Sequence, residues 1–417
     1  MKISKTYLRM AAIAIIVIAV GGLLGWYYFL HKAEVQTSTQ NAEAGYDTAA
    51  PTFEGSTGST YENTVSTLGE VPGISSASST SRLWEVSEVP VAGFGWQSGT
   101  APTLYFVERS SGYVFDAQTR SRSVTRLTDT LRPKIYQASI TLDGSVLERS
   151  VDDTGSLITF TGAVGSTTQA DVSDSASSSA SDLIGSDLPT GITAIAADPA
   201  YDTLYYAIPG SSGVTLVSTN WTGEKEKQLF SSAIEGWQLF APGDGTLVFQ
   251  QDALDGVEGY AYQLQKSGSL SLIAEAPGLT VLPHASSTAL IFGSSSSGSL
   301  SLFVQSSAKA SPERVSIGTV ADKCAWAPGA SLIAYCGAPQ TIPSQQFLDD
   351  WYKGLVHTAD KFYEIDASAG STTLIYDPSG DTNAQLDVED PSVDPSGQYI
   401  AFINAKDQSL WVLQIAQ

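Results

Sequence analysis

The sequence predicts an all-β protein, a seven-bladed β-propeller, because one hairpin pattern recurs along the chain while the part after residue 30 keeps no apolar positions at helical spacing. In each hairpin, a turn rich in Pro, Gly, Asp and Ser precedes four or five apolar residues with β-branched and aromatic members, which is strand composition. The first apolar residues after the turns are Leu104, Val146, Leu204, Leu247, Leu290, Leu332 and Tyr399. Seven markers predict seven blades.

The spacing of these markers separates the repeat from its insertions. Consecutive markers lie 42, 58, 43, 43, 42 and 67 residues apart, and a period near 43 with a hairpin in each unit is typical of a propeller blade. Neighbouring blades cover both faces of each sheet, which explains continuous apolar runs such as Leu204-Tyr205-Tyr206-Ala207. The two long spacings indicate insertions of about 15 and about 24 residues.

Ring closure provides a second line of evidence. After Tyr399 the chain has room for the rest of that strand and for one more, Leu410 to Ile415, so the last blade lacks a strand. The stretch from Arg82 to Ser87 precedes the first marker hairpin and alternates like an outer strand. We expect it to complete the last blade, which would close the ring and remove an exposed edge.

The turns before the marker strands carry a family resemblance. They read Asp198-Pro199, Pro242-Gly243-Asp244-Gly245, Ala327-Pro328-Gly329 and Asp394-Pro395-Ser396-Gly397. This pattern resembles the WD-repeat and TolB-like propeller families over about residues 82–417, although the Trp-Asp dipeptide of WD repeats is absent. The whole layout is similar to membrane-anchored bacterial propeller proteins of unknown function. The resemblance implies a shape and a location, and no chemistry.

The N-terminal region predicts a membrane anchor. Residues 10–30 are predominantly apolar and uncharged, long enough to cross a bilayer as a helix. Lys2, Lys5 and Arg9 precede them, so residues 1–9 are expected in the cytoplasm and the propeller outside it, in a single-pass protein of the cell membrane. A cleaved signal peptide is the alternative, but the apolar stretch exceeds the usual length of roughly 7–15 residues.

Two further predictions concern the same region. Gly21 and Gly25 form a Gly-x-x-x-Gly pair through which two membrane helices can approach, although membrane helices are rich in glycine in any case. Residues 31–81 are rich in Ser, Thr and Gly and predict a flexible linker before the propeller, residues 82–417.

Charge narrows the range of partners. The chain carries 21 basic and 43 acidic residues, a net charge of −22. Four basic residues and no acidic one lie in residues 1–32, so the remainder has 17 basic and 43 acidic residues, a net charge of −26. Such a surface repels nucleic-acid phosphates and anionic lipid, so no nucleic-acid partner is expected. Cationic or neutral partners remain open.

The two insertions differ in composition. Residues 165–181 are a low-complexity Ser-rich segment that predicts a disordered surface loop. The second insertion, about residues 338–361, is expected between the second and third strands of blade six, on the face that carries the blade-to-blade connections. It contains aromatic and acidic residues that could form a lid or a partner-binding ridge. The candidate binding residues are Asp349, Asp350, Trp351, Tyr352 and His357.

A structural alternative exists for this second insertion. A short helix could pack Phe347, Leu348, Trp351 and Leu355 on the blade and leave Asp349 and Asp350 as solvated acids. The two readings differ in which aromatic side chains are exposed.

Cys324 and Cys336 are the only cysteines. In a hairpin centred near residue 330 they face each other at a distance that suits a bridge, and a disulfide is the expected outcome outside the cytoplasm. The pair offers too few ligands for a metal site.

Catalytic motifs are scarce. The sequence has three histidines and no Gly-x-Ser-x-Gly elbow, His-Glu-x-x-His or EF-hand loop, so we expect no catalytic residue set and no cofactor. Calcium is a minor possibility at five aspartates near the last hairpin, although Asp is also a favoured turn residue. They are Asp377, Asp381, Asp387, Asp390 and Asp394.

Two functions follow from this reading. The first is a non-catalytic binding or scaffold module displayed outside the membrane for protein, peptide or glycan. The second is a cell-envelope hydrolase or lyase that uses carboxylates of the propeller channel, although a fold by itself is poor evidence for activity.

Overall fold

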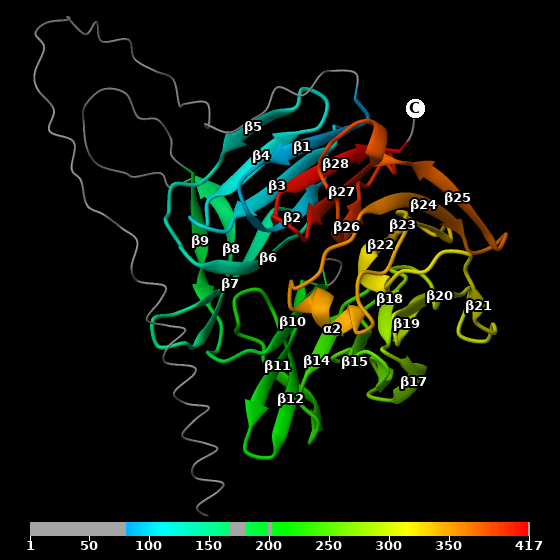
Figure 1. The fold of residues 1–417 in the computed structure, drawn as a ribbon. Coiled ribbons are helices and arrows are strands. Elements are labelled where there is room, and N and C mark those ends of the chain that lie inside the picture. The colour runs from blue at the N-terminus through cyan, green and yellow to red at the C-terminus, as the bar shows by residue number, and fades with distance from the viewer. Residues whose placement is uncertain (1–80, 100, 167–180, 199–201, 416–417) are drawn as a thin grey trace, which may run out of the picture. The chain divides into compact units, whose positions relative to one another are not determined.

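The structure is a computed structural model that describes residues 81–99, 101–166, 181–198 and 202–415. These residues form seven antiparallel four-stranded sheets arranged as blades around a ring (Figure 1). The predicted seven-bladed propeller is confirmed, and with it the resemblance to WD-like and TolB-like propellers at the level of the fold.

We number the blades in chain order. Blade one contains β2 (Val91–Gln97), β3 (Thr103–Glu108), β4 (Val114–Gln118) and β5 (Ser123–Arg126). Blade two contains β6 (Ile135–Ile140), β7 (Ser145–Val151), β8 (Leu157–Ser166) and β9 (Ser181–Asp187). Blade three contains β10 (Ala194–Asp198), β11 (Thr203–Gly210), β12 (Gly213–Thr219) and β13 (Lys227–Ser232). Blade four contains β14 (Trp237–Phe240), β15 (Leu247–Gln251), β16 (Glu258–Leu264) and β17 (Leu270–Pro277).

The last three blades hold the short helices. Blade five contains β18 (Thr280–Pro283), β19 (Leu290–Ser296), β20 (Ser299–Gln305) and β21 (Glu313–Arg314). Blade six contains β22 (Cys324–Trp326), β23 (Ile333–Pro339), β24 (Asp360–Asp366) and β25 (Ser371–Tyr376), with η1 (Ala321–Lys323) before it and α2 (Phe347–Tyr352) inside it. After η2 (Pro378–Gly380), blade seven contains β26 (Val388–Val393), β27 (Tyr399–Asn404), β28 (Leu410–Gln414) and β1 (Leu83–Ser87).

Blade seven joins the two ends of the propeller. Strand β1 pairs antiparallel with β28, with Leu83 opposite Leu413 and Trp84 opposite Val412. The predicted closure is therefore confirmed, and β28 is an interior strand of its sheet. The side chains of β1 and β28 fill the cores on both sides of blade seven.

The hydrophobic core is divided among the blade interfaces. Along β11, Leu204 and Tyr206 pack in the cluster shared with blade two, whereas Tyr205 and Ala207 pack in the cluster shared with blade four. Successive strand residues point to opposite faces, so a sheet covered on both faces needs an uninterrupted apolar run. The marker residues lie in the second strand of each blade, or directly before it for Leu332.

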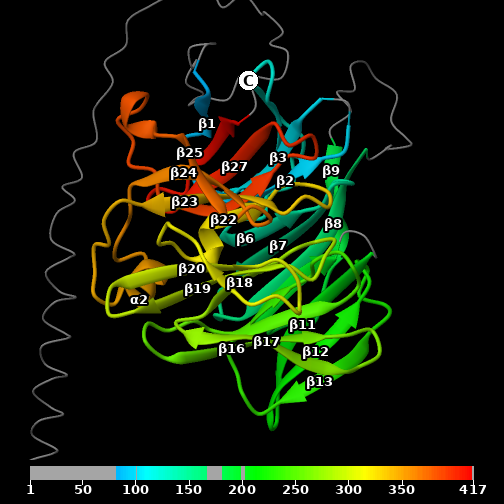
Figure 2. The same cartoon turned by 90° about the vertical axis from the view of Figure 1, so that its right-hand side faces the viewer.

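The first strands of the blades lie toward the middle of the ring, and those of neighbouring blades contact each other between β2 and β6, β10 and β14, β22 and β26, and β26 and β2 (Figure 1). Figure 2 shows the same ring from the side. Between β2 and β6 the approach is so close that a Cβ on Gly95 would lie 2.0 Å from the Ile140 carbonyl oxygen. Only glycine is compatible with this contact, which fixes blade one against blade two.

The predicted disulfide is present. Cys324 and Cys336 form a cross-strand pair between β22 and β23 with a Cα–Cα distance of 4.1 Å, and their sulfur atoms are bonded. The bridge lies in the buried core between blades five and six.

Several sequence predictions fall outside the described residues. They include the membrane helix at residues 10–30, the Gly21–Gly25 pair, most of the linker and most of the Ser-rich insertion, residues 167–180. The ends of that insertion belong to β8 and β9, where Gly165 pairs with Asp182. In the described part of the chain, no helix has the length and apolar character needed to span a membrane.

Candidate functional site

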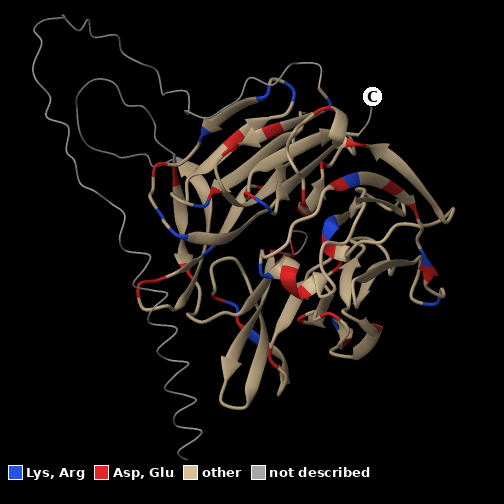
Figure 3. Cartoon of the chain, in the orientation of Figure 1, with Lys and Arg blue, Asp and Glu red and all other residues tan. Residues whose placement is uncertain are grey.

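The second insertion lies where the sequence places it, between β23 and β24 of blade six. Its helix α2 covers the middle of the ring on one face, which we call the insertion face (Figures 1 and 2). Figure 3 shows acidic positions on α2, and η1, which α2 contacts through Tyr352, contains Asp322 and Lys323, so charged groups gather at this point.

One side of α2 is a small core of its own. Phe347 and Leu348 are fully buried and Trp351 is 6% exposed, packed on residues of blades four and five and on Val320. The helical alternative is therefore confirmed for these three residues. It is wrong for Leu355, which lies past the end of α2 and is 68% exposed.

The two aspartates of α2 hold the insertion in place. Asp349 accepts a hydrogen bond from the backbone N–H of Asp255 in blade four at 3.1 Å, and Asp350 accepts one from the Ser344 hydroxyl. Both side chains are half-buried, so the expectation that they are solvated acids is wrong. The hydrogen bonds of Asp349, Asp350 and Trp351 all go to other residues of this chain.

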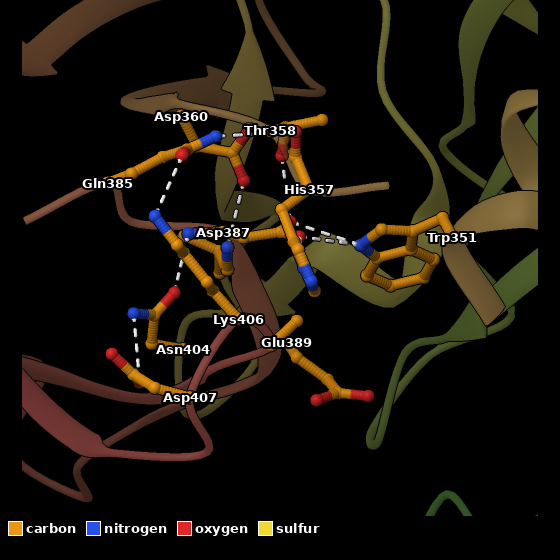
Figure 4. Close-up of polar contacts among 12 residues, drawn as sticks. Trp351, His357, Thr358, Asp360, Gln385, Asp387, Glu389, Asn404, Lys406 and Asp407 are labelled. Carbon is orange, nitrogen blue, oxygen red and sulfur yellow. Dashed lines mark hydrogen bonds and ion pairs between the residues drawn. The ribbon is translucent and has the colours of Figure 1, made fainter. Parts of the chain in front are cut away.

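A buried ion cluster lies beneath α2 (Figure 4). The Lys323 ammonium is fully buried and donates to Asp360 Oδ2 at 2.7 Å, to Thr358 Oγ1 at 2.9 Å and to Asp387 Oδ1. It also lies 4.8 Å from the centre of the Trp351 ring. Taking charged groups out of water is costly, and the contacts of the ammonium with both carboxyl groups offset part of that cost, although Asp360 Oδ1 is buried without a hydrogen-bond partner among the described residues.

The two carboxyl groups around Lys323 have pKa values shifted in opposite directions. Burial raises the pKa of Asp360, and the nearby charge of Asp387 adds to that shift, against the opposing effect of Lys323. Burial acts on Asp387 in the same direction, but the Lys323 charge and hydrogen bonds from Lys323, Thr358 and Trp351 outweigh it and lower its pKa. Asp387 is therefore the more acidic of the two carboxyl groups, and it contacts four side chains at once.

His357 is the fourth of these side chains. Its Nδ1 lies 3.2 Å from Asp387 Oδ2, and its side chain is 24% exposed. A carboxylate can only accept hydrogen bonds, so Nδ1 is the donor in this contact. In Figure 4 the ring extends toward Glu389 on β26.

Tyr352 marks a second group of charges on the insertion face. Its ring is 41% exposed, while its hydroxyl donates to Asp322 Oδ1 at 3.0 Å. Burial around the hydroxyl raises the pKa of Tyr352, with the charges of Asp322 and Asp252 adding to the effect. Tyr352 thus joins the insertion to η1 at the inner end of blade six.

Asp322, Glu389 and Asp390 form what we call the inner acidic cluster. Burial raises the pKa of Asp322, and repulsion from Glu389 contributes. For Asp390, loss of bulk water together with the charges of Glu389 and Asp322 raises the pKa to about 7, although the side chain remains accessible. Asp390 lies at a bulge of β26 and has a positive φ of 47°.

The structure thus divides the predicted binding residues. Tyr352 contacts Asp322 and His357 contacts the buried Asp387, whereas Asp349, Asp350 and Trp351 serve to fix the insertion. Asp322, Lys323 and Glu389 are not among the residues predicted from the sequence. The sequence signal that could have found them is a charged residue at or just before the start of the first strand of a blade, where most residues are apolar.

The five aspartates considered for calcium have separate surroundings. Asp377 pairs with Lys361, Asp381 accepts from the Tyr376 hydroxyl, and Asp394 accepts backbone N–H groups of its own turn. Asp387 and Asp390 belong to the two clusters described above. Among the described residues, no three or more His, Cys, Asp or Glu side chains are grouped as a metal ion would require.

The opposite face of the ring carries a different kind of site. A depression of about 480 Å³ is lined by residues of the inner strands and turns, including Phe94, Trp96, Ile140, Leu142 and Val393. It is mainly apolar, in contrast to the charged insertion face.

Comparisons with known proteins identify solved structures only. No family model matches the chain, and no curated protein matches it. The β-propeller domain of the Trilobed protease from Pyrococcus furiosus aligns with a TM-score of 0.49 at 8% identity, over 79% of this chain and 95% of that chain. Virginiamycin B lyase from Staphylococcus aureus aligns with a TM-score of 0.46 at 11% identity, over 80% of this chain and 98% of that chain. TolB from Acinetobacter baumannii aligns with a TM-score of 0.39 at 10% identity, over 76% of this chain and 64% of that chain. These scores carry no functional argument.

Proposed function

We propose that this chain is a membrane-anchored extracytoplasmic propeller that acts as a non-catalytic binding or scaffold module for protein, peptide or glycan. Residues 10–30 are the anchor and the insertion face is the binding surface. The proposal is supported above all by the way the insertion is held. Buried contacts to blades four, five and seven fix α2, and the same segment presents Tyr352 and His357 next to the inner acidic cluster.

This arrangement suits recognition for a physical reason. Binding costs less conformational entropy when the contacting side chains are already fixed in the free protein. Trp351 donates to both oxygens of Asp387 at 3.0 Å, and this contact sets the direction of the neighbouring Tyr352. An exposed aromatic ring on a rigid support is a common anchor in protein interfaces.

The binding function is tested by capture. Full-length protein in a non-ionic detergent is used to capture partners from the native cell envelope, and the captured species are identified by mass spectrometry. A variant with Tyr352→Ala and His357→Ala is expected to lose the captured species while its melting temperature stays within about 2 °C of wild type, because both side chains are partly exposed. Equal capture by this variant would refute the assignment to the insertion face. Capture should persist in the control Leu142→Ala, which lies on the opposite face.

The anchor is tested separately. Deleting residues 10–30 is expected to release the protein from the membrane fraction. Protease added to intact spheroplasts is expected to degrade the propeller of the wild-type protein. Protection from protease would refute the extracytoplasmic location.

A second candidate function is favoured by one observation. Asp390, with a pKa of about 7, lies beside Glu389 and Asp322, and such a group can donate and accept protons at neutral pH. A hydrolase or lyase acting on envelope polymer would use these carboxyl groups. Release of soluble fragments from purified envelope by wild type, and loss of that release in Asp390→Asn, would establish this function in place of the first.

A further inference from the structure

A cleft of about 360 Å³, which we call the side cleft, lies between blades four and five. Its walls come from the turns β14–β15 and β18–β19, from the β16–β17 hairpin and from the end of β20. In an antiparallel blade, the turn after the first strand and the connection after the second lie at opposite ends, so the side cleft opens on the face opposite the insertion. Its volume is within the range of about 300–1,000 Å³ that is typical of small-molecule sites.

The floor of the side cleft is apolar and buried. Val248 and Leu290 are 1% and 4% exposed and belong to the core shared by the two blades. Leu272 also lines the cleft and is 50% exposed, so a ligand can cover apolar surface there. Apart from the imidazole of His284, no aromatic side chain is among the lining residues, so a nucleobase or an aromatic side chain finds little to stack on.

A chain of hydrogen bonds fixes the polar groups of the blade-four wall. Gln265 Nε2 donates to Gln263 Oε1 at 2.8 Å, and Gln263 Nε2 donates to Thr246 Oγ1 at 3.2 Å. The Thr246 hydroxyl in turn donates to Asp244 Oδ1 at 2.6 Å. In the described part of the chain, these bonds use one hydrogen of each amide nitrogen and only Oδ1 of the carboxyl group. A second N–H of each glutamine and Asp244 Oδ2 therefore remain for a ligand.

The blade-five wall is held by bonds to its neighbours. The Ser286 hydroxyl donates to the Gly329 carbonyl oxygen of blade six at 2.7 Å, and the Ser286 N–H donates to His284 Nδ1 at 3.1 Å. The same turn carries Thr288, whose Oγ1 accepts from the Ala308 N–H at 3.0 Å. The hydroxyl hydrogen of Thr288 is thus available as a donor, on a turn that is fixed before any ligand binds.

The charge of the lining excludes two classes of ligand. No lysine or arginine is among the lining residues, so a phosphate or carboxylate ligand would meet an acid without a counter-charge. Asp244 is the only acid there, and it already accepts two bonds from Thr246, so a cation gains little. A carboxylate beside neutral donors suits hydroxyl groups, because each hydroxyl donates and accepts at the same time.

We propose that the side cleft binds a neutral sugar unit of a glycan. Two neighbouring sugar hydroxyls can donate to Asp244 Oδ2 and accept from the glutamine amides, which the hydrogen-bond chain keeps beside this carboxyl group. Thr288 bonds a hydroxyl from the other wall, and Leu272 covers C–H surface of the ring. Because both walls are fixed in the free protein, binding costs little conformational entropy. This site lies outside the insertion face and goes beyond the function proposed above.

A peptide is the other occupant that such a cleft could take. A peptide strand would pair with the backbone N–H and C=O groups of β17, the outermost strand of blade four. The groups that remain for a ligand here belong to side chains on two facing blades, which favours a ligand with hydroxyls on several sides.

The test uses full-length protein in a polyoxyethylene detergent, because a detergent with a sugar head group would compete for the site. Ligand-observed saturation-transfer NMR compares the methyl glycosides of glucose, galactose, mannose and N-acetylglucosamine with tetrahydropyran-2-methanol, which keeps the ring but lacks the ring hydroxyls. We expect at least one glycoside to bind with a dissociation constant of about 1–10 mM and tetrahydropyran-2-methanol to bind at least about ten-fold more weakly. Equal binding of tetrahydropyran-2-methanol, or binding by none of the four glycosides, overturns the proposal.

Two further probes distinguish the ligand class. Methyl glucuronide carries an acid on the same ring and should bind more weakly than methyl glucoside. Stronger binding of the glucuronide would show attraction by the exposed Lys266 and Lys309 next to the cleft in sequence, and would overturn the choice of a neutral sugar. Binding of the neutral peptide acetyl-Ser-Gly-Ser-amide, with no binding of any glycoside, would overturn the choice of a sugar.

Protein variants locate the site. Gln265→Ala on one wall and Thr288→Val on the other are each expected to weaken glycoside binding about three- to ten-fold. Gln118→Ala removes a glutamine from the same end of the third strand in blade one and should change binding less than about two-fold. No effect of the two cleft variants, or an equal effect of Gln118→Ala, overturns the site. The comparison between ligands needs no variant, so it decides the question even where a substitution impairs folding.

One variant separates this inference from the proposed function. The protein with Tyr352→Ala and His357→Ala should bind the glycoside as wild type does, because these residues lie in the insertion on the other face. Loss of envelope capture with unchanged glycoside binding would support two independent faces. Loss of glycoside binding in this variant would place the sugar on the insertion face and overturn the inference.

Discussion

Replacing Lys323 with methionine tests whether the buried ion cluster holds the insertion on the ring. Lys323→Met keeps the length of the side chain but leaves Asp360 and Asp387, which are 1% and 0% exposed, without their cation. Removing one partner of a buried, hydrogen-bonded ion pair typically costs about 3–5 kcal/mol, because the remaining charge stays buried. We expect Lys323→Met to lower the free energy of unfolding by this amount.

The expected loss translates into a measurable change in melting temperature. Unfolding entropy is about 2.1 cal/mol/K per residue, so a propeller of about 335 residues has about 0.7 kcal/mol/K, and the loss lowers Tm by about 4–7 °C at pH 7.5. Circular dichroism and urea unfolding provide the two measurements. The loss of stability should be smaller at pH 5. Without Lys323 the pKa values of the two carboxyl groups rise in the folded state, so these groups take up protons more readily in the folded than in the unfolded chain as the pH falls.

Two controls keep this prediction specific. Lys353→Met changes an exposed lysine of the same insertion and should alter stability by less than about 0.5 kcal/mol. Adding Asp387→Asn to Lys323→Met removes one of the two stranded charges and should restore part of the loss. A Tm within about 1 °C of wild type for Lys323→Met at pH 7.5 would show that the cluster does not support the fold.

Three further predictions concern stability. Replacing Cys324 and Cys336 with alanine should cost about 3 kcal/mol by the chain-entropy estimate, seen as a lower urea midpoint, and non-reduced peptide mass spectrometry of the native protein should detect the bridge rather than two free thiols. Gly95→Ala places a methyl group against a neighbouring carbonyl and should cost more than about 3 kcal/mol, whereas Gly380→Ala meets open space and should cost less than about 1; similar losses would refute the proposed close approach of β2 and β6. Burial raises the pKa of Glu148 to about 7 against the opposing effect of its arginine partner, so the folded state keeps a proton that the unfolded chain loses, and stability should fall as pH rises from about 4.5 to 7. Glu148→Gln should reduce this fall in the urea midpoint between pH 5 and 7.5, and an unchanged fall would contradict the assignment.

The fold follows from the sequence because a propeller repeats one local pattern. Leu104 and Leu247 both follow a turn and both lie at the start of the second strand of a blade, so counting such residues counts the blades. Closure was predictable because a four-stranded unit leaves an obvious shortage after Leu413. The disulfide was predictable because facing positions in a hairpin follow from its centre.

The candidate site was predictable only in part. Composition located the insertion, but composition does not show which side of a six-residue helix is covered. Trp351 and Tyr352 are adjacent aromatic residues, yet one is buried on Asp387 and the other is 41% exposed. Lys323 is separated by 64 residues from Asp387, and only the packing of blade six against blade seven brings them together.

The pairing of β1 with β28 has a consequence for synthesis of the protein. Leu83 is made early, and its partner Leu413 follows about 330 residues later, which at roughly 5–20 residues per second is a delay of about 15–65 s. During that time blade seven cannot form, and the face of blade one that packs on blade seven stays uncovered. A nascent chain interrupted before Leu410 would keep that face open, so truncated products should be substrates for chaperones and proteases, while a complete chain becomes resistant in a single late step.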